Sequence, residues 1–223
     1  NPDEFAAYQQ TIMPRTVFLK NLPREASVVD LGAGDGGLSA LKAWPTPARP
    51  DLRLYAVSLE KGLYFDRYEN FVLGDFNREL PQLNDRSFDA LLCCNFLEHI
   101  EDPERCIEWI SSVLKPGGRV FLEWPHETWK TMPSMTALKE RGYEAYTTNF
   151  WDDNTHVDAW PMERILSAMA EHRLQVETSG RLFFPWLGDE LRDHGVKNND
   201  MPQRTYGVWL RFGLGQFVVA SKA

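Results

Sequence analysis

The chain has 223 residues, a formal net charge of −8 and 43% hydrophobic residues, which suits one α/β domain with a sizeable core. An acidic surface repels phosphate backbones, so nucleic acid is disfavoured as a substrate. No apolar stretch is as long as a membrane span, the first residues carry no signal-peptide pattern, and Cys93, Cys94 and Cys106 provide no paired disulfide framework. We therefore expect a cytoplasmic protein without nucleic-acid or membrane partners.

Residues 3–22 have apolar side chains at helical spacing, and Pro14 should split them into two helices. Short apolar segments then recur along the chain, with helical segments between them. Strands are expected at 27–31, 52–59, 70–75, 88–94, 119–124, 174–180 and 215–222, and helices at 36–43, 103–114 and 161–171. Buried strands that alternate with helices indicate a Rossmann-like α/β fold, a doubly wound and mostly parallel seven-stranded sheet with helices on both faces.

The glycine-rich segment VVDLGAGDGG, residues 28–37, joins the first expected strand to the next helix. Gly32, Gly34 and Gly37 satisfy the spacing G-x-G-x-x-G, which is typical of dinucleotide-binding loops. A pyrophosphate needs free backbone N–H groups and no neighbouring anion, yet Asp30 and Asp35 place two carboxylates there. Each close carboxylate would cost roughly 1 kcal/mol or more beside a phosphate. A ligand that carries an ammonium and a sulfonium group would instead gain from them.

Four motifs in this order resemble the class I S-adenosylmethionine-dependent methyltransferases, especially their small-molecule, type 11/12-like branch. They are VVDLGAGDGG at 28–37, GDF at 74–76, FDALLCCNFLEHIEDP at 88–103 and LKPGG at 114–118. The resemblance covers roughly residues 25–125, and the two last expected strands fit its seven-stranded ending. It implies S-adenosylmethionine as the cofactor and an enzyme that transfers the methyl group to a small-molecule acceptor.

The resemblance also implies how the glycine-rich segment holds the cofactor. The backbone of Gly32, Ala33 and Gly34 should lie against the methionine part of S-adenosylmethionine. Asp30 should orient this loop and the amino group of the cofactor, partly through water. These roles follow from the family pattern, and the glycine spacing alone does not establish them.

Residues after the third and fourth expected strands receive roles in the same way. Asp75 should accept a hydrogen bond from the adenine amino group, and Phe76 should lie against the adenine ring. Asn95 should lie near the reactive end of the cofactor. Glu98 and His99 open the following segment, and in similar enzymes this pair faces or supports the site.

One position departs from the family pattern. Family members usually end the second strand with an acid that binds both ribose hydroxyls, and the aligned residue here is Ser58. Glu60 comes two residues later and would point to the same side of a strand as Ser58. We expect a small bulge or a longer strand to bring Glu60 to the ribose, with Ser58 as the alternative contact.

Three segments match no motif and are expected to cover the acceptor side of a single methyltransferase domain, residues 1–223. They are an N-terminal helical segment, about 1–24, and two insertions, about 127–160 and 181–212. Because these segments carry no readable pattern, the acceptor itself cannot be read from them.

Methyl transfer is an in-line displacement, so a base is needed only where the acceptor must lose a proton. His126 follows the fifth expected strand and His156 lies in the first insertion, so each is a candidate catalytic base. The polar residues near His156 have three interpretations: a divalent-metal site, a substrate or base site, or a structural cap of the next helix. They are Asp152, Asp153, Asn154 and Asp158. We assign no metal ligands.

The leading hypothesis is O-methylation of a small molecule, by a monomer or a homodimer, with N- or C-methylation left open. A methyltransferase-like domain that binds cofactor or a protein partner without catalysis is the main alternative. A nicotinamide-dependent oxidoreductase would use the three spaced glycines, but Asp35 and the later motifs argue against it. Nucleic-acid methylation is disfavoured by the net charge of −8.

Overall fold

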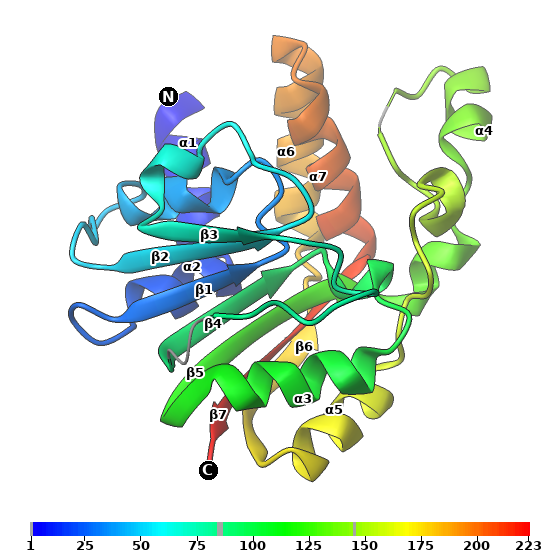
Figure 1. The fold of residues 1–223 in the computed structure, drawn as a ribbon. Coiled ribbons are helices and arrows are strands. Elements are labelled where there is room, and N and C mark those ends of the chain that lie inside the picture. Colours follow the sequence, from blue (N-terminus) through cyan, green and yellow to red (C-terminus); the bar gives the residue numbers. More distant parts are fainter. Residues whose placement is uncertain (1, 84–86, 145) are drawn as a thin grey trace.

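The computed structural model describes residues 2–83, 87–144 and 146–223. In these ranges seven strands form one sheet in the order β3-β2-β1-β4-β5-β7-β6 (Figure 1). The strands are β1 (Ser27–Leu31), β2 (Arg53–Ser58), β3 (Asn70–Leu73), β4 (Phe88–Cys94), β5 (Leu114–Pro125), β6 (Leu174–Arg181) and β7 (Gly215–Lys222). Strands β1 to β5 pair in parallel, and β7 is antiparallel to both β5 and β6. The expected mostly parallel, seven-stranded sheet is confirmed.

Helices cover both faces of this sheet. They are α1 (Pro2–Ile12), α2 (Pro14–Lys20), α3 (Pro103–Val113), α4 (Met135–Glu140), α5 (Met162–Glu171), α6 (Pro185–Asn198) and α7 (Met201–Phe212). Pro14 separates α1 from α2, as its fixed φ and missing N–H predict. None of the helices described here is long and apolar enough to cross a membrane.

Two large apolar clusters pack against the two faces of the sheet. Leu91 and Leu122 join the cluster that contains α3 and α5. Leu92 and Phe121, one residue away on the same strands, join the cluster that contains α2. Because successive side chains point to opposite faces, the central strands are buried on both sides and have continuous apolar sequences.

Two elements differ from the sequence prediction. The segment expected as a helix at 36–43 is a 3-10 helix, Gly37–Lys42. Strand β5 begins at Leu114, five residues before the expected start at 119, because Leu114 already pairs with Phe88 across a register shift. Gly117 has φ 74°, so the glycine turn after α3 is absorbed as an irregularity within the strand.

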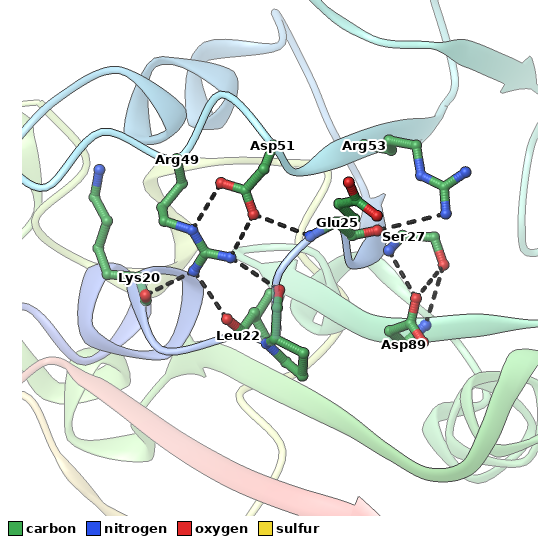
Figure 2. A network of polar contacts seen from close by, with 9 residues as sticks. Lys20, Leu22, Glu25, Ser27, Arg49, Asp51, Arg53 and Asp89 are labelled. Carbon is green, nitrogen blue, oxygen red and sulfur yellow. Dashed lines mark hydrogen bonds and ion pairs between the residues drawn. The ribbon is translucent and has the colours of Figure 1, made fainter.

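Arg49 holds the loop before β2 against the end of α2, at the amino end of the parallel strands (Figure 2). Its guanidinium donates hydrogen bonds to the carbonyl oxygens of Lys20, Leu22 and Pro23, at 2.7, 2.9 and 2.8 Å. It also forms two hydrogen bonds to the Asp51 carboxylate, at 3.0 and 2.8 Å, which lower the pKa of that carboxyl group. The network therefore fixes the amino ends of β1 and β2, at the edge of the sheet opposite to the carboxyl ends of these strands.

The expected insertion at 181–212 is a pair of packed helices, α6 and α7, beside the carboxyl end of β5 (Figure 1). Gly188 and Gly207 allow their backbones to approach closely, because a Cβ atom added at Gly188 would lie 2.6 Å from the Gly207 carbonyl oxygen. Helix α4 belongs to the other insertion and lies apart from the sheet (Figure 1).

Candidate functional site

A cleft of about 460 Å³ lies at the carboxyl ends of β1, β2, β3 and β4. Ligands of doubly wound sheets bind at this position, where the helical connections leave a crevice. The residues that line it are Gly32, Gly34, Val57, Ser58, Leu59, Gly74, Asp75, Phe76, Asn77, Asn95, Phe96, His99, Ile100 and Thr155.

The structure brings most of the expected cofactor residues together in this cleft. Those that line it are Gly32, Gly34, Ser58, Asp75, Phe76, Asn95 and His99. Asp30, Ala33 and Glu60 are not among the lining residues. The motifs after β1, β3 and β4 therefore meet at one edge of the sheet, as their positions at strand ends predict.

The glycine loop uses most of its own N–H groups internally. Gly32 and Ala33 both donate to the Val57 carbonyl oxygen, at 2.9 and 3.0 Å, and Gly36 donates to the Ala33 carbonyl oxygen at 2.8 Å. Gly37 donates to Oδ1 of Asp35 at 2.7 Å. A pyrophosphate would need such donors free, so the loop offers a ligand a close backbone surface and few anion-binding groups.

Asp30 is buried beneath this loop, with 3% of its surface exposed. The Tyr68 hydroxyl donates a 2.5 Å hydrogen bond to Oδ2 of Asp30, while Oδ1 has no hydrogen-bond partner among the described residues. Burial raises the pKa of Asp30 to about 6, although the hydrogen bond from Tyr68 opposes that rise. Asp30 thus supports the loop from below, and Tyr68 is a partner that the sequence motifs do not indicate.

The second strand ends at Ser58, so the bulge or strand extension expected to carry Glu60 into the site is not formed. Ser58 is buried and lines the cleft, whereas Glu60 is exposed and lies outside it. The chain turns back after Ser58 because Gly62 packs directly on the glycine loop. A Cβ atom added at Gly62 would lie 2.4 Å from the Gly34 carbonyl oxygen.

Asp75 and Phe76 follow β3 on the adjacent wall. Asp75 accepts a hydrogen bond from the Asn77 N–H at 3.0 Å and forms an ion pair with the exposed Arg78 at 3.1 Å. Phe76 is buried, and its ring meets those of Phe96 and Trp109 edge-on. This packing fixes the Asp75 segment against the cleft.

Asn95 is held in an unusual backbone conformation directly after β4. Its φ is 51°, in the left-handed region that asparagine tolerates better than most residues. Its N–H donates to the Glu123 carbonyl oxygen at 2.8 Å. Asn95 also borders a small cavity that contains Glu123 and Tyr206, so it lies between the cleft and the helical cover.

An aromatic cavity of about 530 Å³ lies beyond that small cavity, under the helical cover. Tyr206 and Trp209 of α7 line both cavities, and Trp44 and Tyr146 complete the aromatic wall of the larger one. Among the described residues, its lining contains no lysine, arginine or histidine, and its polar side chains are Gln9, Gln10, Thr147, Asp200, Gln203 and Thr205. This space suits an apolar or aromatic group better than an anion.

A buried ion pair holds the cover to the sheet. The Arg15 guanidinium of α2 lies 3.6 Å from the Glu123 carboxylate and donates a 2.8 Å hydrogen bond to the Tyr206 hydroxyl of α7. Burial raises the pKa of Glu123, and the charge of Arg15 opposes that rise. The three side chains join α2, β5 and α7 next to the cavity that Asn95 borders.

His126 lies outside the cleft. Strand β5 continues to Pro125, so His126 begins the next turn, where its Nδ1 accepts a 3.1 Å hydrogen bond from the Thr128 N–H. Its backbone N–H donates to the Leu214 carbonyl oxygen at 2.7 Å. Burial and the nearby Arg181 guanidinium lower the pKa of His126.

His156 packs beside the cleft, although it is not a lining residue. Its Nδ1 lies 2.6 Å from the Phe150 carbonyl oxygen, and its ring centroid is 4.9 Å from that of His99. His99 and Thr155 do line the cleft, and Nδ1 of His99 lies 3.2 Å from the Thr155 carbonyl oxygen. The first insertion therefore reaches the edge of the cleft through residues 155 and 156.

The acidic residues around His156 have two different roles in the structure. Asp152 accepts backbone hydrogen bonds from Met135, Thr148 and Asn149, and Asp158 pairs with Lys130, so both are structural. Glu98 instead reaches the two histidines. One potential ligand atom from each of Glu98, His99 and His156 lies within 4.8 Å of the others, a spacing at which they could hold a metal ion.

The model of a methyltransferase domain family matches residues 5–179 of the chain. The ubiquinone biosynthesis O-methyltransferase of Xanthomonas axonopodis pv. citri (strain 306) is 33% identical over 177 residues, which cover 74% of this chain and 69% of that protein. The enzyme of the same name from Xanthomonas oryzae pv. oryzae (strain PXO99A) is 31% identical over 172 residues, 72% of this chain and 68% of that protein.

Solved structures of methyltransferases share the fold. A phosphoethanolamine N-methyltransferase 2 from Haemonchus contortus, in complex with S-adenosyl-L-methionine, gives a TM-score of 0.64 at 16% identity, over 93% of this chain and 52% of that one. A putative sarcosine dimethylglycine methyltransferase from Galdieria sulphuraria gives 0.59 at 16% identity, over 94% of this chain and 83% of that one.

Proposed function

The chain belongs to the class I S-adenosylmethionine-dependent methyltransferases, and we propose that it methylates a hydroxyl group of a small, apolar or aromatic molecule. The observation that carries this proposal is the position of Asn95, which lines both the cleft at the strand ends and the small cavity that shares Tyr206 and Trp209 with the aromatic cavity. Methylation at oxygen is supported by the relatives named O-methyltransferases, at 33% and 31% identity.

S-adenosylmethionine, when bound, supplies an activated methyl carbon, and the cleft fits its charge. The loop N–H groups of Gly32, Ala33 and Gly37 are already taken, and the Asp30 carboxylate lies beneath them, which favours a cationic ligand over a pyrophosphate. We assign Gly32 and Gly34 to the methionine part.

We assign the remaining cofactor contacts to residues at the carboxyl ends of β2, β3 and β4. We assign Ser58 to the ribose hydroxyls, because it is buried and lines the cleft where Glu60 does not. Asp75 and Phe76 would hold the adenine, and Asn95 would lie at the methyl end. Asp30 and Ala33 would act through the shape of the loop.

We also propose that residues 1–223 act as one domain, in which α1, α2 and the segments 127–160 and 181–212 cover the acceptor. His156 is a better candidate than His126 for accepting the hydroxyl proton. Its neighbours His99 and Thr155 line the cleft, whereas Nδ1 of His126 is occupied by Thr128 outside it. Methyl transfer requires the acceptor oxygen and the methyl carbon to be in line and roughly 3 to 3.5 Å apart. In that geometry, loss of the hydroxyl proton is the only activation that the acceptor needs.

Isothermal titration with S-adenosylhomocysteine tests the cofactor contacts. We expect micromolar binding by the wild type, at least tenfold weaker binding by Asp75→Ala and by Ser58→Val, and unchanged binding by Glu60→Ala, the matched control. Equal affinity in all four proteins would overturn the assigned contacts.

A transfer assay tests the acceptor. The enzyme would be incubated with S-adenosylmethionine carrying a ¹³C-methyl group and a panel of phenols, catechols and aromatic amines. A product whose methyl carbon has the chemical shift of an O-methyl group supports the proposal. Exclusive N-methyl or C-methyl products would overturn it, and cofactor binding without any product would favour the non-catalytic alternative.

A further inference from the structure

We propose that Glu98, His99 and His156 bind a divalent transition-metal ion at the edge of the cofactor cleft. The three side chains come from two segments that are distant in the sequence. Glu98 and His99 follow β4 in the 3-10 helix Leu97–His99, and His156 follows the 3-10 helix Phe150–Asp152 of the first insertion. Their potential ligand atoms all lie within 4.8 Å of one another, close enough for a small side-chain adjustment to place them around one ion.

Both histidines are oriented as metal ligands usually are. Nδ1 of His156 lies 2.6 Å from the Phe150 carbonyl oxygen, and Nδ1 of His99 lies 3.2 Å from the Thr155 carbonyl oxygen. We assign the proton to each Nδ1, because a carbonyl oxygen only accepts and the Thr155 hydroxyl, 3.0 Å from Nδ1 of His99, already donates to Asp153. Each Nε2 then keeps a free lone pair. Metal-binding histidines are typically held by such a hydrogen bond from the other ring nitrogen.

Glu98 provides an independent observation. Only 2% of its surface is exposed, and its Oε2 has no hydrogen-bond partner among the described residues. A buried carboxylate oxygen without a partner is costly unless a cation or a donor reaches it. The charged groups nearest to it in effect, Glu123 and Asp153, are both carboxylates. A divalent cation would supply the missing positive charge.

The ligand set indicates the class of ion. Two imidazoles and one carboxylate suit Zn²⁺, Co²⁺, Mn²⁺ or Fe²⁺, whereas Mg²⁺ and Ca²⁺ prefer an all-oxygen set. Three protein ligands leave coordination positions open, as in catalytic sites. His99 lines the cleft together with Asn95 and Thr155, so the open positions border the cleft. Asp153, with Oδ2 at 3.8 Å from Nε2 of His156, adds negative charge beside the ion.

An ion at this place would bind the acceptor oxygen and lower the pKa of its hydroxyl group, so that the oxygen attacks as an alkoxide or phenoxide. With the ion bound, Nε2 of His156 is a ligand and is not free to act as the base, so the ion takes over the activation of the hydroxyl group that we assigned above to His156. The proton leaves to solvent, and the C–S bond breaks as the O–C bond forms. This role in the reaction rests on the proposed function, whereas metal binding itself does not.

Co²⁺ is the probe for the site, because its visible absorption reports the ligands directly. The full chain would be stripped with a chelator and titrated with Co²⁺ alone, by absorption and by calorimetry. We expect one ion per chain, with affinity at least 30-fold lower in Glu98→Gln and in His156→Gln. His172→Gln, a half-buried histidine outside the group, should bind as the wild type does.

A folded wild type that binds no Co²⁺, or variants that bind it equally well, would overturn the proposal. Urea midpoints and S-adenosylhomocysteine affinity show whether each variant is folded, and His99→Gln replaces any variant that is not. Methyl transfer is measured separately with and without metal. Binding of Co²⁺ with equal transfer rates in both conditions supports the site and overturns its part in the reaction, while an absent transfer activity leaves the binding result standing.

Discussion

The Tyr68 hydroxyl donates a 2.5 Å hydrogen bond to Oδ2 of Asp30 beneath the glycine loop, while Oδ1 of Asp30 has no hydrogen-bond partner among the described residues. The carboxyl group is buried, and desolvation raises its pKa to about 6. At neutral pH the protein therefore carries a buried negative charge under the site at a cost in folding free energy. A cationic ligand above the loop would offset part of that cost.

Asp30→Asn should stabilise the protein more at neutral pH than at low pH. An unfolded aspartate has a pKa near 3.8, so the folded wild type binds its proton more tightly than the unfolded chain does. The stability that this proton provides is complete below pH 3.8 and is lost as the pH rises through about 6, by up to roughly 3 kcal/mol. Urea unfolding of both proteins between about pH 4 and 8 measures the difference.

An amide at residue 30 does not titrate, so its effect on the free energy of unfolding is the same at each pH. The prediction is therefore tested by how the stability difference between Asp30→Asn and the wild type changes with pH. Asp51→Asn provides a control whose difference from the wild type should stay nearly constant between about pH 4 and 8. Arg49 lowers the pKa of Asp51, so the stability from that carboxylate is present above its unfolded pKa and is lost as the pH falls. A constant difference between Asp30→Asn and wild type over the whole range would show that Asp30 has an ordinary pKa.

Gly32→Ala should weaken cofactor binding. Gly117→Ala is its control, because it separates the effect of backbone strain from the effect of the contact with Phe96. Both glycines have positive φ, 78° and 74°, which costs an alanine about 1–2 kcal/mol. A Cβ atom at Gly32 would also lie 2.5 Å from the Phe96 ring, which lines the cleft, whereas no atom of the described residues lies within 4 Å of one at Gly117. Displacing Phe96 should weaken S-adenosylhomocysteine binding at least tenfold.

Titration calorimetry and urea unfolding of both variants check this prediction. Gly117→Ala should lose about 1 kcal/mol of stability and keep wild-type affinity, while Gly32→Ala should lose roughly 3 kcal/mol. Wild-type affinity in Gly32→Ala would mean that Phe96 moves freely and that the close packing at Gly32 does not shape the cleft.

The features that could be predicted from sequence are those set by local patterns. Leu91 to Cys94 form a continuous apolar run because both faces of β4 are buried, so the strand was recognisable without its neighbours. Asp75 and Asn95 were recognisable from the resemblance, because they stand in the family motifs that follow the third and fourth strands. Parallel strands place their carboxyl ends at one edge, which brought these two residues into one cleft.

The features that could not be predicted depend on contacts between distant segments. Glu60 was expected at the ribose, but Gly62 packs on the glycine loop and turns the chain away after Ser58. No pattern around Tyr68 indicates its hydrogen bond to Asp30. Likewise, the sequence around His156 suggested a cluster with its neighbours, whereas the fold places His156 next to Glu98 and His99, from another part of the chain.

Arg49→Met should destabilise the fold without affecting the site. The guanidinium satisfies three carbonyl oxygens and the Asp51 carboxylate, and its side chain is 12% exposed (Figure 2). Loss of these charge-assisted hydrogen bonds should cost roughly 3 kcal/mol of unfolding free energy. Affinity for S-adenosylhomocysteine should stay unchanged, because the network lies at the amino end of the strands.

Arg53→Met is the matched control for this change. Arg53 is exposed and makes one long hydrogen bond, 3.4 Å to the Glu25 carbonyl oxygen, so its loss should cost no more than about 0.5 kcal/mol. Urea unfolding and titration calorimetry of the two variants give both quantities. Equal destabilisation by the two substitutions would show that loss of the positive charge, and not loss of the buried hydrogen bonds, determines the change in the free energy of unfolding.

Trp44→Ala should raise the KM for the acceptor and leave cofactor binding unchanged. Trp44 lines the aromatic cavity under the helical cover but not the cofactor cleft. Its side chain is 42% exposed, so truncation leaves no large hole in the core. Loss of one aromatic wall should weaken acceptor binding by about tenfold. The kcat should change little, because Trp44 lines neither the cofactor cleft nor the small cavity that Asn95 borders.

Trp186→Ala controls for the loss of an exposed indole, since Trp186 is 54% exposed and does not line that cavity. Initial rates with the phenolic acceptor found in the transfer assay give KM and kcat for both variants. A raised KM in Trp44→Ala alone places the acceptor in the aromatic cavity, with its hydroxyl directed past Asn95. An unchanged KM in both variants would instead mean that the acceptor enters through the cofactor cleft, and that the cavity under α7 serves another purpose.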